Sequence, residues 1–232
     1  MEDIASLQRA LRILHVQYHV PNVVITSIPL KPWLASALPT SIRPFPSVSS
    51  CSSTSSSSFP SRSSSPFSPE QTVTDSYLLC ISSAIDPISH TSASLSSVHA
   101  QIVPFIPGYF TGVGDLFSAL LLAHFYPSFI APCSTPASSN STPLCHASSL
   151  ALSKTHRLLL LTNSKTLSLP EEERLPSDDE LDRVSPSRKT RRMRGRELAL
   201  IQGQGIIRGE EEVERRDMIV WEGFWELESQ TN

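Results

Sequence analysis

Two glycines and an acid stand together at the start of a long apolar run, in the stretch GYFTGVGDLFSALLLAHF of residues 108–125. Asp115 could cap the helix that this run predicts, since a carboxylate accepts unpaired backbone N–H groups and complements the helix dipole. Capping does not require glycine, however. Gly112 and Gly114 permit positive φ and a close approach of a ligand, so their N–H groups could face an anion. The pattern therefore fits either a capped core helix or an anion-binding turn beside a carboxylate.

Other residue types that carry chemistry form weaker patterns. His15 and His19 are four residues apart, which on a helix could hold a metal, but the residues between them lack the glutamate of a zinc-protease motif. The other five histidines, His156 among them, have no metal-ligand spacing and are expected to be surface or core residues. The four cysteines form no CxxC pair. We therefore expect no metal site in the chain itself and a reducing compartment.

The elements that would position these residues follow from hydrophobic periodicity. Residues 3–18 predict an amphipathic helix, and the apolar VVITSI of residues 23–28 predicts a strand buried on both faces, as in an α/β repeat. The helix after Gly114 is apolar nearly all round, which predicts burial in a layered core. The other expected elements are strands at 76–85 and 99–106, a helix at 148–163, a closing strand at 196–208 and an aromatic edge cover at 218–228.

Three segments rich in Ser, Pro or charge interrupt this pattern, at 39–72, 127–147 and 170–195. They carry too little apolar surface to offset the entropy of ordering, so we predict disordered insertions there. The ordered parts are then expected at about 3–30, 76–126, 148–169 and 196–228. The last insertion runs acidic and then basic. Its basic half could be a nuclear-import signal, although a solvated loop is the favoured interpretation.

The bulk composition argues against several classes of protein. A formal net charge of -3 over 232 residues disfavours a general nucleic-acid or membrane-surface binder. The N-terminal MEDIASLQRALRILH lacks the basic start and apolar core of a secretory signal, and the apolar run at 116–123 is too short to span a bilayer. We therefore expect a cytoplasmic protein, with nuclear entry as an option, that contacts neither nucleic acid nor membrane.

Five segments occur in an order that resembles the C-terminal half of pyridoxal kinases, fungal ones in particular, within the ribokinase-like superfamily. They are VVITSI, YLLCISS, FTGVGDLFSALLLA, LALSKTHRLLLL and RELALIQ. GDLFSALLLA is the most specific, because the wider superfamily shares GxGD but not the residues after it. The resemblance covers most of the chain outside the insertions. It implies a single incomplete kinase domain over residues 1–232, with a partial three-layer α/β/α fold.

The resemblance also implies an activity and assigns roles to residues. The reaction is ATP-dependent phosphorylation of the 5′-hydroxymethyl group of pyridoxal, pyridoxine or pyridoxamine, which serves vitamin B6 salvage. Asp115 takes the position of the catalytic base, and the N–H groups of Gly112, Val113 and Gly114 would form the anion hole. The implied nucleotide contacts are Thr26, Ser27, Ser83, Val103, Phe105 and Ile106. ATP with Mg²⁺ is the implied cosubstrate, and family members usually form homodimers.

Two departures from the family affect the expected activity. Val113 stands where the family usually has threonine, and a lost hydrogen bond to a charged group costs about 1.5–3 kcal/mol, or ten- to a hundredfold in rate. The family's N-terminal half, with the pyridoxal pocket and a magnesium-organising NxxE motif, precedes the region matched here. We therefore expect the chain alone to expose one edge of a parallel sheet, to bind nucleotide poorly and not to turn over pyridoxal.

Two other functions stay open at this stage. The chain could be a non-catalytic interaction or regulatory protein on a remnant kinase fold, with its serine-rich and basic segments binding partners. It could also be another ribokinase-like small-molecule kinase, since substrate choice depends on the N-terminal half. The LFSALLLA and RELALIQ segments favour pyridoxal kinase over that last option.

Overall fold

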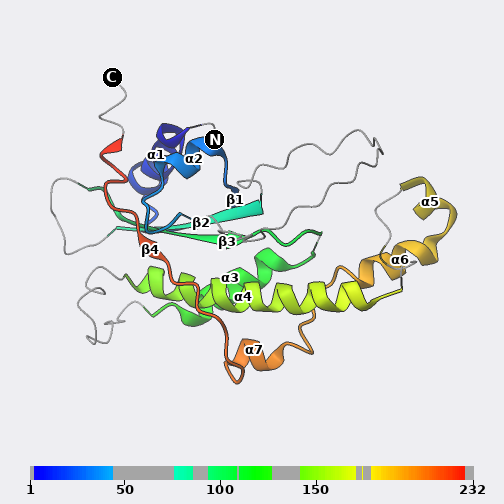
Figure 1. Ribbon diagram of the computed structural model, residues 1–232. Coiled ribbons are helices and arrows are strands. Elements are labelled where there is room, and N and C mark those ends of the chain that lie inside the picture. The colour runs from blue at the N-terminus through cyan, green and yellow to red at the C-terminus, as the bar shows by residue number, and fades with distance from the viewer. Residues whose placement is uncertain are drawn as a thin grey trace, which may run out of the picture.

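The computed structural model of the protein describes residues 3–43, 76–85, 94–108, 110–126, 142–170, 174 and 179–227. Within these ranges, helices surround a four-stranded sheet (Figure 1). Of the insertions predicted at 39–72 and 127–147, residues 44–72 and 127–141 lie outside the described residues. None of the helices in the described part is both long and apolar enough to cross a membrane.

The sheet follows the order β1-β2-β3-β4, and each neighbouring pair is antiparallel. The prediction of a parallel sheet is therefore wrong, because an apolar run indicates burial of a strand but not the direction of its neighbours. The predicted burial of β1 on both faces is wrong too, since β1 is an edge strand in which only Val23 is buried. The strands are β1 (Asn22–Pro29), β2 (Tyr77–Ala84), β3 (Ser97–Pro104) and β4 (Ile219–Val220).

Helices cover both faces of the sheet (Figure 1). On one face lie α1 (Ile4–Arg12), its π-helical continuation (Ile13–Gln17) and α2 (Pro32–Ala37). On the other face α3 (Val113–His124) packs beside α4 (Pro143–Ser168). A hydrophobic core lies on each face of the sheet. Side chains of β2 point alternately into one core and the other, because successive residues of a strand point to opposite faces. Leu79 and Ile81 pack under α1 and α2, whereas Cys80 packs against α3 and α4.

Two helices begin at residues of types that are common at helix starts. The Asp3 carboxylate accepts a hydrogen bond from the Ser6 N–H at 2.7 Å, which caps α1. At α4, the Thr142 hydroxyl oxygen accepts from the Cys145 N–H at 3.1 Å, and Pro143 occupies the first helical position. These signals begin α4 inside the predicted insertion at 127–147, so that boundary is corrected to residue 143.

The apolar helix α3 is not buried all round, contrary to prediction. Only Phe117 and Leu120 are buried, while Leu122 is 77% exposed. The reason is that α3 packs on the sheet and α4 with one side. Its outer side faces away from both (Figure 1).

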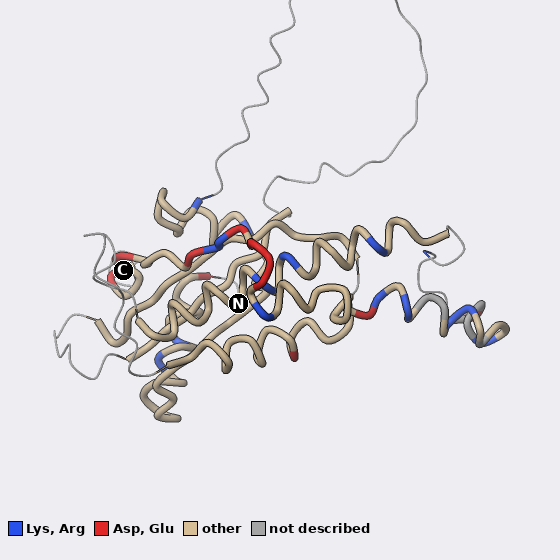
Figure 2. Tube along the Cα trace, turned by 90° about the horizontal axis from the view of Figure 1, so that it is seen from below, with Lys and Arg blue, Asp and Glu red and all other residues tan. Residues whose placement is uncertain are grey.

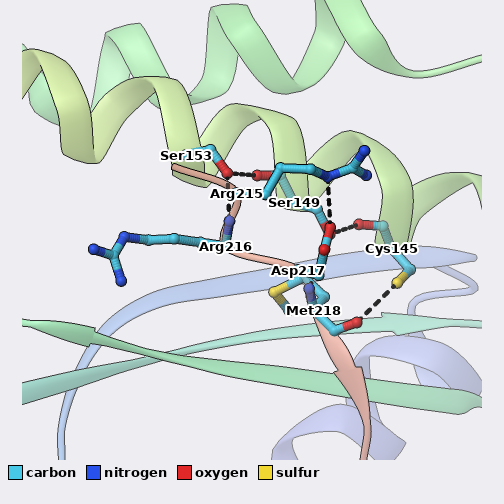
Figure 3. A network of polar contacts seen from close by, with 7 residues as sticks. All are labelled: Cys145, Ser149, Ser153, Arg215, Arg216, Asp217 and Met218. Atoms are coloured by element: carbon cyan, nitrogen blue, oxygen red, sulfur yellow. Dashed lines mark hydrogen bonds and ion pairs between the residues drawn. The ribbon is translucent and has the colours of Figure 1, made fainter. Parts of the chain in front are cut away.

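A row of hydroxyls on α4 fastens the returning C-terminal segment to the helix (Figure 3). Ser149 and Ser153 each donate to the backbone carbonyl four residues earlier, at 2.8 and 2.7 Å. Their oxygens then accept backbone N–H groups of Met218 and Arg216, at 2.9 and 2.8 Å. Further along α4, the Thr162 hydroxyl oxygen accepts the Ala199 N–H at 3.0 Å. These bonds satisfy buried backbone donors that have no strand partner, and they lead the chain into β4.

The segment predicted to close the sheet at 196–208 is not a strand. Glu197 makes one isolated parallel bridge with Thr111, and α7 (Gln204–Arg208) follows. In the predicted insertion at 170–195, the structure has α5 (Asp179–Val184) and α6 (Pro186–Arg194). Lys and Arg residues gather along α6, at the far right of Figure 2.

Candidate functional site

A pocket of about 590 Å³ lies where β1, β2 and β3 meet the start of α3 and the middle of α4. Seven of the residues predicted from the sequence line it, although they come from three separate parts of the chain. Apolar side chains make up most of the remaining wall. A concave, mostly apolar pocket with a few polar groups is the usual form of a small-molecule site. The seven are Thr26, Ser27, Val103, Phe105, Ile106, Val113 and Gly114.

Thr26 and Ser27 reach the pocket through a bulge in β1. The pairing of β1 with β2 shifts register between Ile25 and Ile28, and the two hydroxyl residues lie in that irregular step. Ser27 has a φ of 59°, in the left-handed region that few non-glycine residues adopt. Bulges re-aim side chains next to active sites, and backbone strain concentrates there. The strain at Ser27 therefore supports a ligand-binding role for this step.

This strain leads to a prediction for the Ser27→Gly variant. Glycine adopts positive φ without the penalty of about 1–2 kcal/mol that other residues incur, but it loses more chain entropy on folding. We expect a gain in unfolding free energy of up to about 1 kcal/mol in urea denaturation. Ser36→Gly, an exposed position within α2, should destabilise instead. A loss of stability in Ser27→Gly would show that relief of the positive φ does not outweigh the added chain entropy and the loss of the hydroxyl.

The glycine turn begins α3. Gly112 is the N-cap, with a φ of 83°, and no side chain caps the helix. The first amides of a helix have no intrahelical partner, so the N–H groups of Val113 and Gly114 are available at the pocket. Asp115 lies in the first turn, is exposed and makes no hydrogen bond or ion pair with the described residues. The capping role considered for Asp115 is therefore not observed.

Asp115 does not itself line the pocket, and neither does Gly112. Asp115 follows directly after Gly114, a lining residue, and is exposed. Two residues of the later segment 196–198 contact the glycine turn. The Thr111 N–H and hydroxyl both donate to the Arg196 carbonyl, at 3.0 and 3.2 Å, and Leu198 lies next to Gly112.

The wall that α4 contributes is the part that the sequence did not predict. It consists of Leu152, Thr155, His156 and Leu159. His156 was expected to be a surface or core residue. Burial, with the Arg216 guanidinium as a second cause, lowers the pKa of His156 to about 4, so its imidazole is neutral at physiological pH. Burial also raises the pKa of the Cys80 thiol on the facing strand to about 12. No Lys or Arg is among the described residues of the pocket wall.

Ser83 was predicted to contact nucleotide, and the structure does not bring it to the pocket. It lies at the far end of β2, fully buried, where its hydroxyl contacts His15 Nε2 and Ser96 Oγ, each at 2.8 Å. His15 Nδ1 donates to the Val20 carbonyl at 2.6 Å, so Nε2 accepts from the Ser83 hydroxyl. His15 is thus a satisfied core residue. The described residues hold no group of three His, Cys, Asp or Glu side chains that could bind a metal.

Comparison with known proteins gives one kind of match. No protein-family model and no curated protein sequence matches this chain. Among solved structures, the chain is similar to pyridoxal kinase from Leishmania donovani in complex with ADP and pyridoxamine, over 95% of this chain and 45% of that one, at 16% identity and a TM-score of 0.45. Pyridoxal kinase from Trypanosoma brucei matches 61% of this chain and 34% of its own, at 18% identity and a TM-score of 0.33.

A second Leishmania donovani pyridoxal kinase structure, in complex with ADP and pyridoxine, reaches 23% identity over 38% of this chain and 24% of that one, with a TM-score of 0.27. The chain spans less than half the length of each of these three structures. The fungal type and the C-terminal half stay predictions.

Proposed function

We propose that this chain is the nucleotide-binding, C-terminal part of a kinase of the pyridoxal kinase type, on a ribokinase-like three-layer fold. The whole protein would transfer the γ-phosphoryl group of ATP to the 5′-hydroxymethyl group of pyridoxal, pyridoxine or pyridoxamine. One observation carries the proposal. Seven of the nine residues that the resemblance assigns to nucleotide contacts or to the anion hole line a single pocket, although 88 positions separate the first, Thr26, from the last, Gly114; Ser83 and Gly112 do not line it.

The pocket has a polar end at the start of α3 and apolar walls from β3 and α4, and the proposed chemistry follows from this difference. The free N–H groups at the start of α3 and the positive end of the helix dipole favour phosphate oxygens. As the substrate oxygen forms its bond to phosphorus and the bond to the β-phosphate oxygen breaks, ADP leaves and Asp115 accepts the hydroxyl proton. The apolar walls from β3 and α4 would hold the base of the nucleotide.

Magnesium is the metal that this reaction implies. Mg²⁺ at such sites is commonly bound by one or two carboxylates together with the phosphates, and it neutralises developing negative charge. No Asp or Glu is among the described residues of the pocket wall, and Asp115 is assigned to accepting the proton, so the residues present do not form a magnesium site by themselves.

The test measures the affinity of the purified chain and of its Asp115→Asn variant for ADP and ATP. Saturation-transfer difference NMR titrations give these affinities. We expect weak but measurable binding of both by the unsubstituted chain. Because the Asp115 carboxylate repels the γ-phosphate, Asp115→Asn should bind ATP about three- to tenfold more tightly, while ADP affinity stays unchanged. Ser118→Ala, one turn along the same exposed face, is the matched control and should behave like the unsubstituted chain.

Two outcomes would contradict the proposal. If neither ADP nor ATP binds, the pocket is not a nucleotide site, and the non-catalytic interaction function becomes the better hypothesis. If Asp115→Asn leaves the ratio of ATP to ADP affinity unchanged, Asp115 does not face the γ-phosphate and cannot be the base.

A further inference from the structure

The hydroxyl of Thr155 differs from the other hydroxyls along α4. Most of them donate to the carbonyl four residues earlier, which satisfies their proton: Ser149, Ser153, Thr162 and Thr166, at 2.7 to 2.9 Å. Thr155 is only 5% exposed, and its Oγ1 has no hydrogen-bond partner. A buried hydroxyl without a partner is costly, so such a group in a native structure calls for an explanation.

The position of Thr155 supplies that explanation, because it lies in the wall of the pocket between Leu152 and Leu159. Ser148 is the informative contrast. Its hydroxyl is equally buried and equally unpartnered on the same helix, but Ser148 does not line the pocket. Of the two unpartnered buried hydroxyls on the described part of α4, Thr155 is therefore the one with access to a ligand of the pocket.

The surroundings of Thr155 restrict the part of a ligand that it can meet. The α4 wall and the facing Leu78, Cys80 and Phe117 are apolar or weakly polar, and His156 is held neutral. Phosphate would not be stable against such a wall, since charged groups need ion pairs or strong hydrogen bonds when desolvated. A flat heteroaromatic ring suits it, because its faces pack on apolar side chains while one edge keeps donors and acceptors.

We infer that Thr155 reads the base of a bound nucleotide, with its hydroxyl forming a hydrogen bond to the polar edge of the heteroaromatic ring. This inference rests on the proposed nucleotide-binding function. Oγ1 is buried and has no hydrogen-bond partner, and rotation about the Cα–Cβ bond exchanges its position with that of the methyl group. Threonine in a helix populates two such rotamers, so the movement is accessible.

The experiment compares Thr155→Val with Thr155→Ser and the control Ser148→Ala, using ADP and inorganic tripolyphosphate as probes. Valine keeps the shape and removes the hydroxyl, whereas serine keeps the hydroxyl. We expect Thr155→Val to bind ADP about tenfold more weakly and tripolyphosphate unchanged, because only ADP carries a base. Thr155→Ser and Ser148→Ala should bind both probes like the unsubstituted chain. The ligand-free melting temperature of Thr155→Val should stay level or rise, since an unpaired buried hydroxyl is removed.

Equal ADP affinity in Thr155→Val and the unsubstituted chain would overturn the inference while leaving the proposed function intact. A parallel loss for ADP and tripolyphosphate, with a lower melting temperature, would also overturn it, because the hydroxyl would then be structural. If the unsubstituted chain binds tripolyphosphate but not ADP, both the inference and the nucleotide-binding function fail.

Discussion

Replacing Phe224 with alanine is expected to lower the free energy of unfolding by about 3–5 kcal/mol, the usual cost of removing a buried aromatic side chain. Phe224 is 2% exposed and joins the C-terminal turn to the core under α1. Its ring meets Trp221 and Trp225 edge-on, each at a centroid distance of 5.0 Å. Such pairs add to the stability gained from burial alone. Urea denaturation followed by tryptophan fluorescence measures the difference.

The control for Phe224→Ala is Tyr126→Ala, an aromatic residue that is 64% exposed after α3. Its cost should stay within about 0.5 kcal/mol, as for surface substitutions generally. If Phe224→Ala does not fold, Phe224→Leu should still fold with a smaller loss of stability. A loss below about 1 kcal/mol for Phe224→Ala would mean that the C-terminal turn is not part of the cooperative core.

The sequence predicted the central elements because each carries its own periodic signal. The amphipathic pattern of α1 and the β-branched or apolar runs of β1, β2 and β3 all correspond to elements within a few residues of their predicted bounds. The direction of the strands could not be predicted in this way, because burial of a strand is the same in either direction. Long-range pairing decides direction, and no local pattern records it.

The segment after Arg196 shows how long-range contacts override a local pattern. Leu198, Ala199, Leu200 and Ile201 are apolar, as in a strand, yet the Ala199 N–H bonds to the Thr162 hydroxyl oxygen rather than to a neighbouring strand. That contact spans 37 positions. It turns the chain along α4, which leaves Leu200 and Ile201 exposed. Propensity is a weak guide where a side chain elsewhere satisfies the backbone.

The site was predictable only where a motif was involved. The glycine turn and Thr26–Ser27 stand out in the sequence, and Thr26, Ser27, Val113 and Gly114 line the pocket. Thr155 and His156 give no such signal, since a threonine and a histidine on a helix are ordinary core or surface residues. Their part in the pocket depends on the packing of α4 beside α3 and β2, which is known only from the structure. Ser83 is the opposite case. Its place on a predicted strand suggested a nucleotide contact, but it lies at the end of β2 away from the pocket, beside His15.

Alanine at Gly112 and alanine at Gly114 should have opposite effects on stability and the same effect on nucleotide binding. Gly112 needs its φ of 83°, so Gly112→Ala should cost about 1 kcal/mol or more of unfolding free energy. Gly114 lies inside α3 with no atom within 4 Å of an added methyl group. Gly114→Ala should therefore gain up to about 1 kcal/mol from helix propensity.

Both variants should bind ADP at least about tenfold more weakly, for different reasons. Alanine at Gly112 misaligns the amides of the turn, and the methyl group at Gly114 occupies the approach of a phosphate to the pocket wall. Gly209→Ala is the matched control, because Gly209 has a φ of 79° at the end of α7 but does not line the pocket. It should lose stability like Gly112→Ala and keep its ADP affinity.

Gly114→Ala separates the two interpretations of the turn most sharply. A turn that only starts a core helix would become more stable with alanine and would leave ligand binding unchanged. An anion-binding turn would become more stable and bind ADP less well. In that case the position needs glycine because a phosphate approaches the backbone there, and not because the helix requires it. Titration of ADP alongside urea denaturation of the same preparations gives both quantities, and unchanged ADP affinity in Gly114→Ala would rule out the phosphate site at α3.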